Sequence, residues 1–252
     1  MIEISNVTKR YGDTTVVDDV SLRIEAGGIT SIIGANGAGK STLLSIMSRL
    51  LPADSGTVTV DGLDVARTPS AQLARRLAVL RQENHMTVRL TVRDLVSFGR
   101  FPHSGGRLTA EDREAVEDAI SYFELGDLAE RQLDQLSGGQ RQRAFVAMVL
   151  CQETDYVLLD EPLNNLDMRH SVHMMNRLRR MADDFGKTVV MVVHDINFAS
   201  CHSDQIVAMR DGSVVAHGDV EAMMRPDVLR KVYDLEIPVH ELDGKRIGVF
   251  YG

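Results

Sequence analysis

At 252 residues, with 44% hydrophobic and 25% charged residues, the chain has the composition of an ordinary soluble globular protein. This length is large for one domain and short for two, so we expect one α/β core with an inserted subdomain. A formal net charge of −8 argues against nucleic acid as a partner, because affinity for a phosphate backbone comes mainly from clustered lysines and arginines.

The sequence also bears on the compartment. The first residues, Met1-Ile2-Glu3, lack the basic and apolar segments of a secretory signal, and no apolar run approaches the ~20 residues needed to span a bilayer. The two cysteines, Cys151 and Cys201, lie far apart without C-x-x-C spacing, which favours a reducing cytosol over a disulfide scaffold. If the protein acts at a membrane, we expect other chains to supply the membrane part.

The N-terminal region, residues 2–33, reads as strands joined by turns at Gly12-Asp13 and Gly27-Gly28. Short strands are predicted at 2–4, 15–17 and 21–25, and an alternating strand at 56–62 ends in an Asp-Gly turn. The strands at 2–4, 15–17 and 21–25 predict an antiparallel β layer.

A β-rich run at 29–33 leads into a glycine-rich loop that fits G-x-x-x-x-G-K-[ST]: Gly34-Ala35-Asn36-Gly37-Ala38-Gly39-Lys40-Ser41-Thr42. Its backbone N–H groups are predicted to bind the phosphates of a nucleoside triphosphate. The helix beginning near Lys40 adds roughly half a positive elementary charge at the same point. Lys40 would neutralise the β- and γ-phosphates, and Ser41 would offer Mg²⁺ a hydroxyl. The alternative is a glycine-rich turn in an unrelated α/β protein.

The middle of the chain changes character. A short helix at 71–76 and a strand at 78–80 lead to Gln82, and the stretch 91–136 is predicted to be a helical subdomain. Within it, Thr109 and Asp112 resemble a capping box with Asp in place of Glu, followed by apolar residues at helical spacing.

A second candidate anion site follows at Ser137-Gly138-Gly139-Gln140. Backbone N–H groups, a hydroxyl and a helix dipole converge there, although the same pattern also suits a plain loop and helix cap. From these residues alone, the two interpretations are equally open.

The β–α alternation then resumes, with buried strands at 156–159 and 188–193, helices at 168–185 and near 198, and a tail ending in a hairpin whose turn is Asp243-Gly244. Near-continuous apolar strands separated by helices indicate a parallel sheet covered on both faces. Asp160 and Glu161 directly follow the first of these strands. Asp160 suits Mg²⁺, and Glu161 suits the activation of a water molecule as a general base. The alternative is a pair of solvated acids at a strand end.

The order of these motifs resembles the nucleotide-binding subunit of an ABC transporter along nearly the whole chain. The resemblance implies a single ABC ATPase domain over 1–252, an α/β phosphate-loop NTPase fold with a parallel sheet, an antiparallel β subdomain and a helical subdomain at about 91–136. It implies ATP and Mg²⁺ as cofactors. It also implies a second copy of the chain in a head-to-tail ATP sandwich, membrane permease subunits, an extracytoplasmic substrate-binding protein, and a place on the cytoplasmic face of the membrane.

The same resemblance implies further residue roles. Ser137, Gly138, Gly139 and Gln140 of one copy would contact the nucleotide of the other copy. Tyr11 would stack on adenine, although it could be a packed aromatic. Gln82 would bind Mg²⁺ and sense the membrane partner, and Asp167 would lie in a loop that crosses between the two ATP sites. His194 would contact the γ-phosphate, with a core histidine as the alternative.

The block 161–170, with His194-Asp195-Ile196-Asn197 after it, resembles ATPases of bacterial ferric-siderophore importers, most closely the catecholate type. Leu163 departs from the Thr that many family members carry at this position, which is not a catalytic ligand. Two alternatives stay open: the ATPase of an exporter, and a soluble ABC ATPase in DNA repair or translation. The second is disfavoured by the single phosphate loop and the acidic charge.

Overall fold

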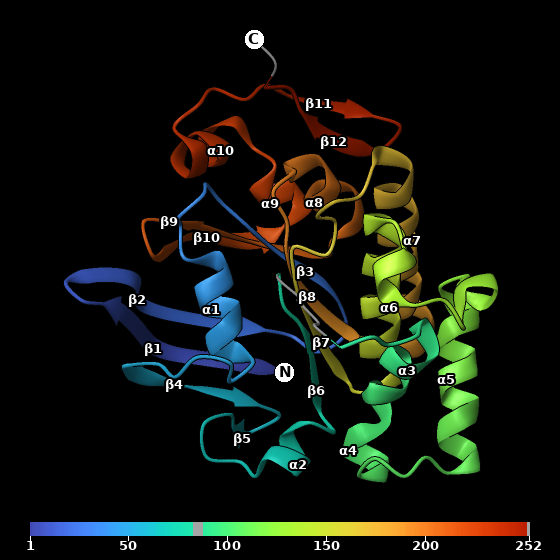
Figure 1. Ribbon diagram of the computed structural model, residues 1–252. Helices are drawn as coiled ribbons and strands as arrows, with labels where there is room; N and C mark the ends of the chain where they lie inside the picture. The colour runs from blue at the N-terminus through green and yellow to red at the C-terminus, as the bar shows by residue number, and fades with distance from the viewer. Residues whose placement is uncertain (83–87, 251–252) are drawn as a thin grey trace. The chain divides into compact units, whose positions relative to one another are not determined.

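The computed structural model describes residues 1–82 and 88–250 (Figure 1). The chain divides into two compact units. One unit combines residues 1–68 with 179–252, and the other is residues 69–178. The phosphate loop belongs to the first unit, and the paired carboxylates belong to the second.

The first unit begins with an antiparallel sheet, as predicted. Its strands, in order across the sheet, are β2 (Thr14–Ile24), β1 (Ile2–Tyr11), β4 (Ser55–Val60) and β5 (Leu63–Asp64). The prediction of two separate strands at 15–17 and 21–25 is wrong, because β2 runs through both. Irregularities in the β1–β2 register take up the polar residues between them, where Asp19 has a φ of 46°.

A second group of strands in this unit is mostly parallel and carries the phosphate loop. Strand β3 (Gly28–Ile33) pairs in parallel with β8 (Thr188–Val192) and β9 (Gln205–Arg210), and β10 (Ser213–Asp219) closes the edge antiparallel to β9. All residues of β8 are buried, which explains their continuous apolar sequence. Helix α1 (Lys40–Met47) follows β3 directly after the loop.

The C-terminal part of this unit contains three short helices and a hairpin. They are α8 (Ile196–His202), α9 (Val220–Met223), α10 (Pro226–Tyr233), β11 (Val239–Leu242) and β12 (Lys245–Gly248). The hairpin turns at Asp243-Gly244 as predicted. Figure 1 shows β12 beside α8, where Asn197 exchanges two hydrogen bonds with the backbone of Gly248.

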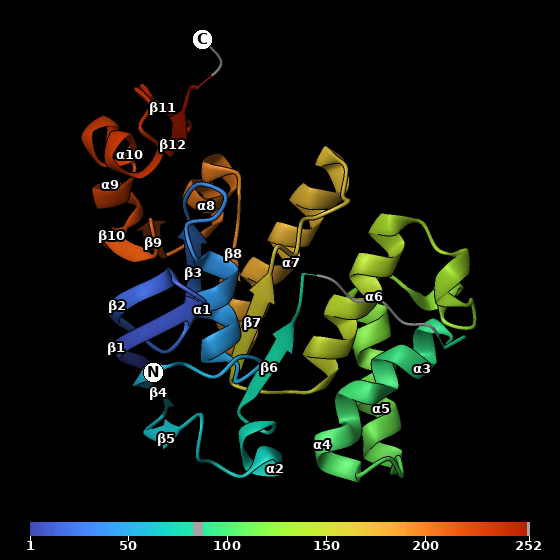
Figure 2. The ribbon, with the colours of Figure 1, turned by 60° about the vertical axis from the view of Figure 1, so that its left-hand side comes forward.

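The second unit is mainly helical. Its elements are α2 (Ser70–Leu73), β6 (Leu77–Leu80), α3 (Val92–Ser97), α4 (Phe101–Ser104), α5 (Ala110–Tyr122), α6 (Gly138–Cys151), β7 (Tyr156–Asp160) and the first part of α7 (Met168–Phe185). Helices α3, α5 and α6 pack side by side (Figure 2), and β6 runs parallel to β7. The helix expected at 71–76 ends at Leu73, so that prediction is too long.

Local signals explain the helices of this unit. The hydroxyl of Thr109 accepts from the backbone N–H of Asp112, and the Asp112 carboxylate accepts from the backbone of Thr109, so the predicted capping box is present. The apolar residues that follow at helical spacing are buried: Val116, Ala119, Ile120 and Phe123. In α7, Met174, Met175 and Met181 are buried, whereas Met168 at its start is 82% exposed.

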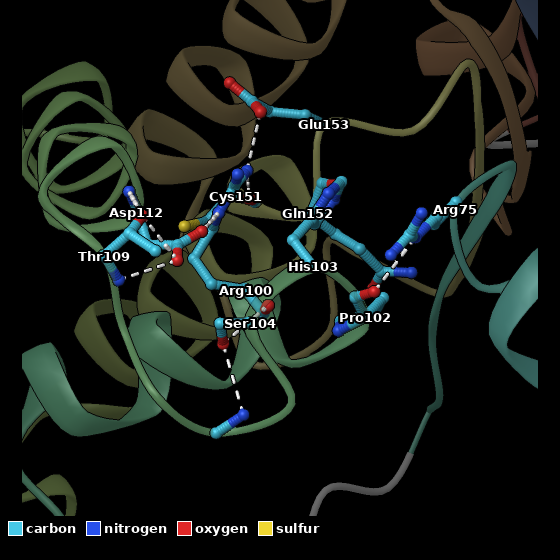
Figure 3. A network of polar contacts seen from close by, with 11 residues as sticks. Arg75, Arg100, Pro102, His103, Ser104, Thr109, Asp112, Cys151, Gln152 and Glu153 are labelled. Carbon is cyan, nitrogen blue, oxygen red and sulfur yellow. Dashed lines mark hydrogen bonds and ion pairs between the residues drawn. The ribbon is translucent and has the colours of Figure 1, made fainter.

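A buried ion pair ties three segments of the helical unit together (Figure 3). The guanidinium of Arg100 donates to Asp112 Oδ1 at 2.9 Å and to Glu153 Oε2 at 2.6 Å, and also to the carbonyl oxygen of Cys151 at 3.0 Å. The side chains of Arg100 and Asp112 are each only 5% exposed. The segment before α4, the start of α5 and the end of α6 therefore meet at one cation.

Both cysteines are free thiols. Burial raises the pKa of Cys151 to about 12, so this thiol stays protonated at neutral pH. Among the described residues, none of the helices is long and apolar enough to cross a membrane.

Candidate active site

The phosphate loop has a backbone that only glycine adopts readily. Gly34, Gly37 and Gly39 have φ values of 145°, 81° and 95°. A Cβ at Gly34 would also collide with the carbonyl of Met209, and one at Gly39 would collide with the carbonyl of Val16. These glycines therefore meet two needs, the sharp turn and the close approach of neighbouring backbone.

Lys40 lies inside the curve of this loop. Its side chain is buried, and Nζ donates to the carbonyl oxygens of Gly34 and Ala35, both at 2.9 Å. Helix α1 starts at Lys40 after Gly39, which has no side chain to cap the first turn. Because the first N–H groups of a helix lack intrahelical acceptors, this helix start attracts anions.

The remaining loop residues line the same segment. Asn36 and Gly37 are exposed at the tip, whereas Ser41 and Thr42 are half-buried in the first turn of α1. The turn between β9 and β10 braces the loop, since Gly212 donates to the carbonyl oxygen of Ala38 at 3.2 Å. The turn between β9 and β10 thus supports the loop at Ala38, while its tip at Asn36 and Gly37 is exposed to solvent.

Two further predicted nucleotide contacts lie in the same unit. Tyr11, at the end of β1, is 53% exposed, with the ammonium of Lys9 at 5.8 Å from the ring centroid. His194 is exposed and follows the buried end of β8. His194 is therefore not a core histidine, and the contacts of Tyr11 and His194 with nucleotide stay predictions.

The second unit brings Gln82 and Glu161 together across 79 positions of sequence. Nε2 of Gln82 donates to Glu161 Oε2 at 2.8 Å, and Nδ2 of Asn164 donates to the same oxygen at 2.9 Å. Glu161 and the preceding Asp160 are buried, with exposed fractions of 9% and 6%. They are not a pair of solvated acids.

The backbone at Glu161 is left-handed, with a φ of 50°. This conformation is costly for a residue with a side chain, and such strain concentrates at functional sites. The amide of Gln142 on α6 donates to the carbonyl oxygen of Pro162 at 3.1 Å and holds the next residue in place. Asn164 and Gln142 escaped the sequence analysis, because both act through contacts that no local spacing reveals.

The Ser-Gly-Gly-Gln segment is a helix cap. Ser137 Oγ accepts from the backbone N–H of Gln140 at 3.3 Å, and the Gln140 side chain accepts from the backbone of Ser137 at 3.0 Å. Ser137 and Gly138 are nonetheless exposed, and Gly138 lies close to Asn165. The capping interpretation is therefore correct in itself, and the predicted contact with a nucleotide is compatible with it.

Asp167 lies immediately before α7. Its Oδ1 accepts from the backbone N–H of His170 at 2.8 Å and from Nδ1 of His170 at 2.7 Å. These two bonds, the backbone one first, lower the pKa of Asp167. The side chain is 66% exposed, so a fixed anion faces solvent here.

Comparison with known proteins gives a consistent result. Residues 17–164 match the family model described as ABC transporter. The sequence is 53% identical over 251 residues to the petrobactin import ATP-binding protein YclP of Bacillus subtilis, covering 100% of both chains. It is 53% identical over 239 residues to the petrobactin import ATP-binding protein FatE of Bacillus anthracis, covering 95% of this chain and 96% of FatE.

Among solved structures, the dimeric post-hydrolysis state of the ATP-binding cassette MJ0796 bound to ADP and Pi is similar, with a TM-score of 0.78 and 30% sequence identity. The match covers 87% of this chain and 99% of that one. Because the family match includes more than half of the chain and the relatives match along nearly all of it, this protein belongs to the ABC transporter family and is an ATPase of that family.

Proposed function

We propose that this ATPase powers the import of an iron(III)-siderophore complex across a bacterial membrane. The observation that carries the proposal is the 53% identity, over the full length of both chains, to a protein named for petrobactin import. A second protein that is also named for petrobactin import has the same 53% identity, over 239 residues. Identity at this level along whole chains favours a shared partner set as well as a shared fold.

In this proposal the first unit binds the triphosphate. The backbone of Gly34 to Gly39 and the start of α1 bind its oxygens, and Lys40 neutralises their charge. Ser41 and Thr42 add hydroxyls from the first helical turn. Tyr11 stacks on the adenine ring, and His194 contacts the γ-phosphate.

The residues present suit Mg²⁺, which prefers oxygen ligands and retains several waters. Ser41 supplies a hydroxyl, Gln82 a carboxamide oxygen, and Asp160 a buried carboxylate. When bound, the ion neutralises charge that develops on the phosphate oxygens.

Glu161 is the proposed general base. It accepts two amide hydrogen bonds on Oε2, which orient the carboxylate, and its strained backbone fixes the direction of the side chain. A water held by this carboxylate would lose a proton to Glu161 as its oxygen attacks the γ-phosphorus, and the bond from that phosphorus to the bridging oxygen would break, with ADP as the leaving group. Gln82 is thereby a direct partner of the base, so a displacement of Gln82 by a membrane subunit would change hydrolysis.

The proposed partners are a second copy of the chain, integral-membrane permease subunits and, through them, an extracytoplasmic substrate-binding protein. The dimeric state of the related cassette MJ0796 supports the second copy. In the dimer, Ser137, Gly138, Gly139 and Gln140 of one copy would complete the ATP site of the other. ATP hydrolysis would change the conformation of the permease, and the permease would move the solute. In this proposal the protein binds the permease on the cytoplasmic face of the membrane.

Uptake measurements test the cargo. A strain lacking the gene is supplied with radiolabelled ferric petrobactin, a ferric catecholate or a ferric hydroxamate, with uptake of an unrelated nutrient as control. We expect uptake of one chelate to fall to background and a wild-type copy to restore it. A Glu161→Gln copy should not restore it.

Undiminished uptake of all three chelates would contradict the proposal. A simultaneous defect in expelling another compound would favour an exporter instead. Normal uptake with the Glu161→Gln copy would separately contradict the assigned base.

A further inference from the structure

His170 makes a contact that an ordinary helix cap does not need. Asp167 precedes α7, and the backbone N–H of His170 already donates to its Oδ1, as in any aspartate cap. Nδ1 of the His170 ring donates a second hydrogen bond to the same oxygen. The ring therefore restricts rotation of a carboxylate that the backbone bond alone would leave less constrained.

The same ring lies against the Ser-Gly-Gly-Gln segment. A Cβ placed on Gly139 would lie 3.9 Å from Cγ of His170 and 3.2 Å from Cδ2 of Leu166. One placed on Gly138 would lie 3.5 Å from Cβ of Asn165. A side chain at either glycine would thus meet Asn165, Leu166 or His170, so the Gly138-Gly139 backbone passes close to these three residues.

The contact does not depend on the charge of His170. Both the imidazolium and the neutral tautomer with hydrogen on Nδ1 can donate to Asp167. The side chain is 40% exposed, and Arg169 is a further nearby cation that interacts with Asp167. A neutral donor at the position of Nδ1 should therefore replace the ring, and the amide of an asparagine provides one.

We propose that His170 is a positioning residue for ATP hydrolysis: its ring holds the carboxylate of Asp167 while lying beside Gly139, so that the Asp167 loop and the Ser137–Gln140 segment meet the second copy as one rigid surface. This inference rests on the proposed two-copy ATP site. It assigns His170 an effect on turnover, with little effect on the binding of ATP to the separate subunit, because its contacts are to the Asp167 loop and Gly139.

The test compares His170→Ala, His170→Asn and His170→Gln in the full-length protein. Asparagine places its amide near the position of Nδ1, whereas glutamine extends past it. His173→Ala, an exposed histidine of the same helix, is the matched control. Steady-state hydrolysis gives kcat and KM, a fluorescent ATP analogue gives the Kd of the subunit, and thermal unfolding monitors the helix cap.

We expect kcat to fall by roughly tenfold to a hundredfold in His170→Ala and His170→Gln, the range that follows from small displacements of site residues. The Kd should change less than about twofold, and His170→Asn should recover most of kcat. In an Asp167→Ala background, His170→Ala should cause little further loss, because the histidine acts through that carboxylate.

Wild-type turnover in His170→Ala would overturn the inference, as would an asparagine variant as slow as the alanine variant. Equal loss of kcat with and without Asp167 would overturn it too. If His170→Ala fails to fold, the asparagine and glutamine pair decides the question. If hydrolysis per wild-type subunit is independent of protein concentration and of dimer formation, the two-copy site itself fails, which is a separate outcome.

Discussion

Lys40 stabilises the fold of its loop and, in the proposed function, also binds the phosphates. Its ammonium bonds two carbonyl oxygens of its own loop, so the positive charge is held where phosphates would bind. The side chain is buried, and burying an ammonium is costly unless it is hydrogen-bonded. The loop conformation and the charge are therefore coupled.

Replacing Lys40 with alanine should weaken ATP binding by at least about tenfold and abolish measurable hydrolysis, because hydrogen bonds to charged groups contribute about 1.5–3 kcal/mol each. Titration with a fluorescent ATP analogue and a phosphate-release assay measure the two effects. Lys231→Ala, which removes an exposed lysine of α10, is the control. Hydrolysis at the wild-type rate in Lys40→Ala would show that the loop does not bind the phosphates.

At the scale of elements, the helical unit is held by the buried cation of Arg100. Its guanidinium donates hydrogen bonds to Asp112 at the start of α5 and to the carbonyl oxygen of Cys151 at the end of α6. Helices α3, α5 and α6 pack around this pair and exclude water from it. Removing one partner of a buried ion pair leaves the other uncompensated.

Arg100→Met should therefore lower the free energy of unfolding by about 3 kcal/mol. Urea unfolding followed by circular dichroism measures the change. Arg113→Met, an exposed position on α5, should change it by less than about 0.5 kcal/mol. Equal stability of the Arg100 variant and the wild type would show that the ion pair contributes no net stability.

The capping box of α5 should also make stability depend on pH. The backbone N–H of Thr109, and then Arg100, lower the pKa of Asp112 from 3.8 to about 2 in the folded protein. A depressed carboxylate pKa contributes stability that is complete above about pH 4 and is lost as pH falls toward 2.

We expect the urea midpoint of the wild type to fall more steeply between pH 4 and pH 2 than that of Asp112→Asn, which cannot titrate. Other carboxylates titrate in both proteins, so the difference between the two curves isolates Asp112. Parallel curves would mean that this carboxylate has the same pKa in the folded and unfolded states.

At the scale of the whole molecule, the proposed sandwich places Lys40 of one copy and Ser137 of the other at the same ATP. Ser137→Arg should then disable the site on the partner copy while its own phosphate loop remains intact. Each homodimer of either variant would contain two defective sites. A dimer of Lys40→Ala with Ser137→Arg would contain one intact site.

Neither variant alone should hydrolyse ATP, whereas an equimolar mixture should recover about a quarter of the wild-type rate if copies pair at random in a symmetric dimer. Phosphate release at matched total protein measures this recovery. Size exclusion of Glu161→Gln with ATP and Mg²⁺ provides the matching physical measurement, since slow hydrolysis should let the dimer accumulate. If both variants are folded but their mixture hydrolyses no ATP, each chain would contain its entire ATP site, and the sandwich arrangement would be wrong.

Several features followed from the sequence because their physical causes are local. The phosphate loop needs glycines at fixed spacing, and the Thr109–Asp112 box forms within one helical turn. The apolar run before Asp160 is continuous because every side chain of β7 is buried. Each of these patterns depends on interactions among a few neighbouring residues, so the structure it forms can be predicted without knowledge of the fold.

The ends of the helices and strands were less predictable, as was the continuation of β2 through both strands predicted at 15–17 and 21–25. The reason is that local sequence propensity competes with pairing between strands. Polar residues between 17 and 21 suggest a break, but backbone hydrogen bonds to β1 continue through them with shifts in register. The end of α2 at Leu73 similarly reflects the approach of β6 to its parallel partner, β7, whose residue Tyr156 donates to the carbonyl oxygen of Arg76.

The sequence by itself determined which chemistry this protein carries: the phosphate loop, the carboxylate pair, the Ser-Gly-Gly-Gln helix start and the order in which they occur. Only the tertiary structure decided how those groups are held, through the two amides on Glu161, the ring of His170 on Asp167 and the carbonyls around Gly34 and Gly39. The physical reason is the separation in sequence between the residues that interact. Conformational preferences and caps act between near neighbours, whereas the hydrogen bond from Gln82 to Glu161 joins residues 79 positions apart and exists only after the chain has folded.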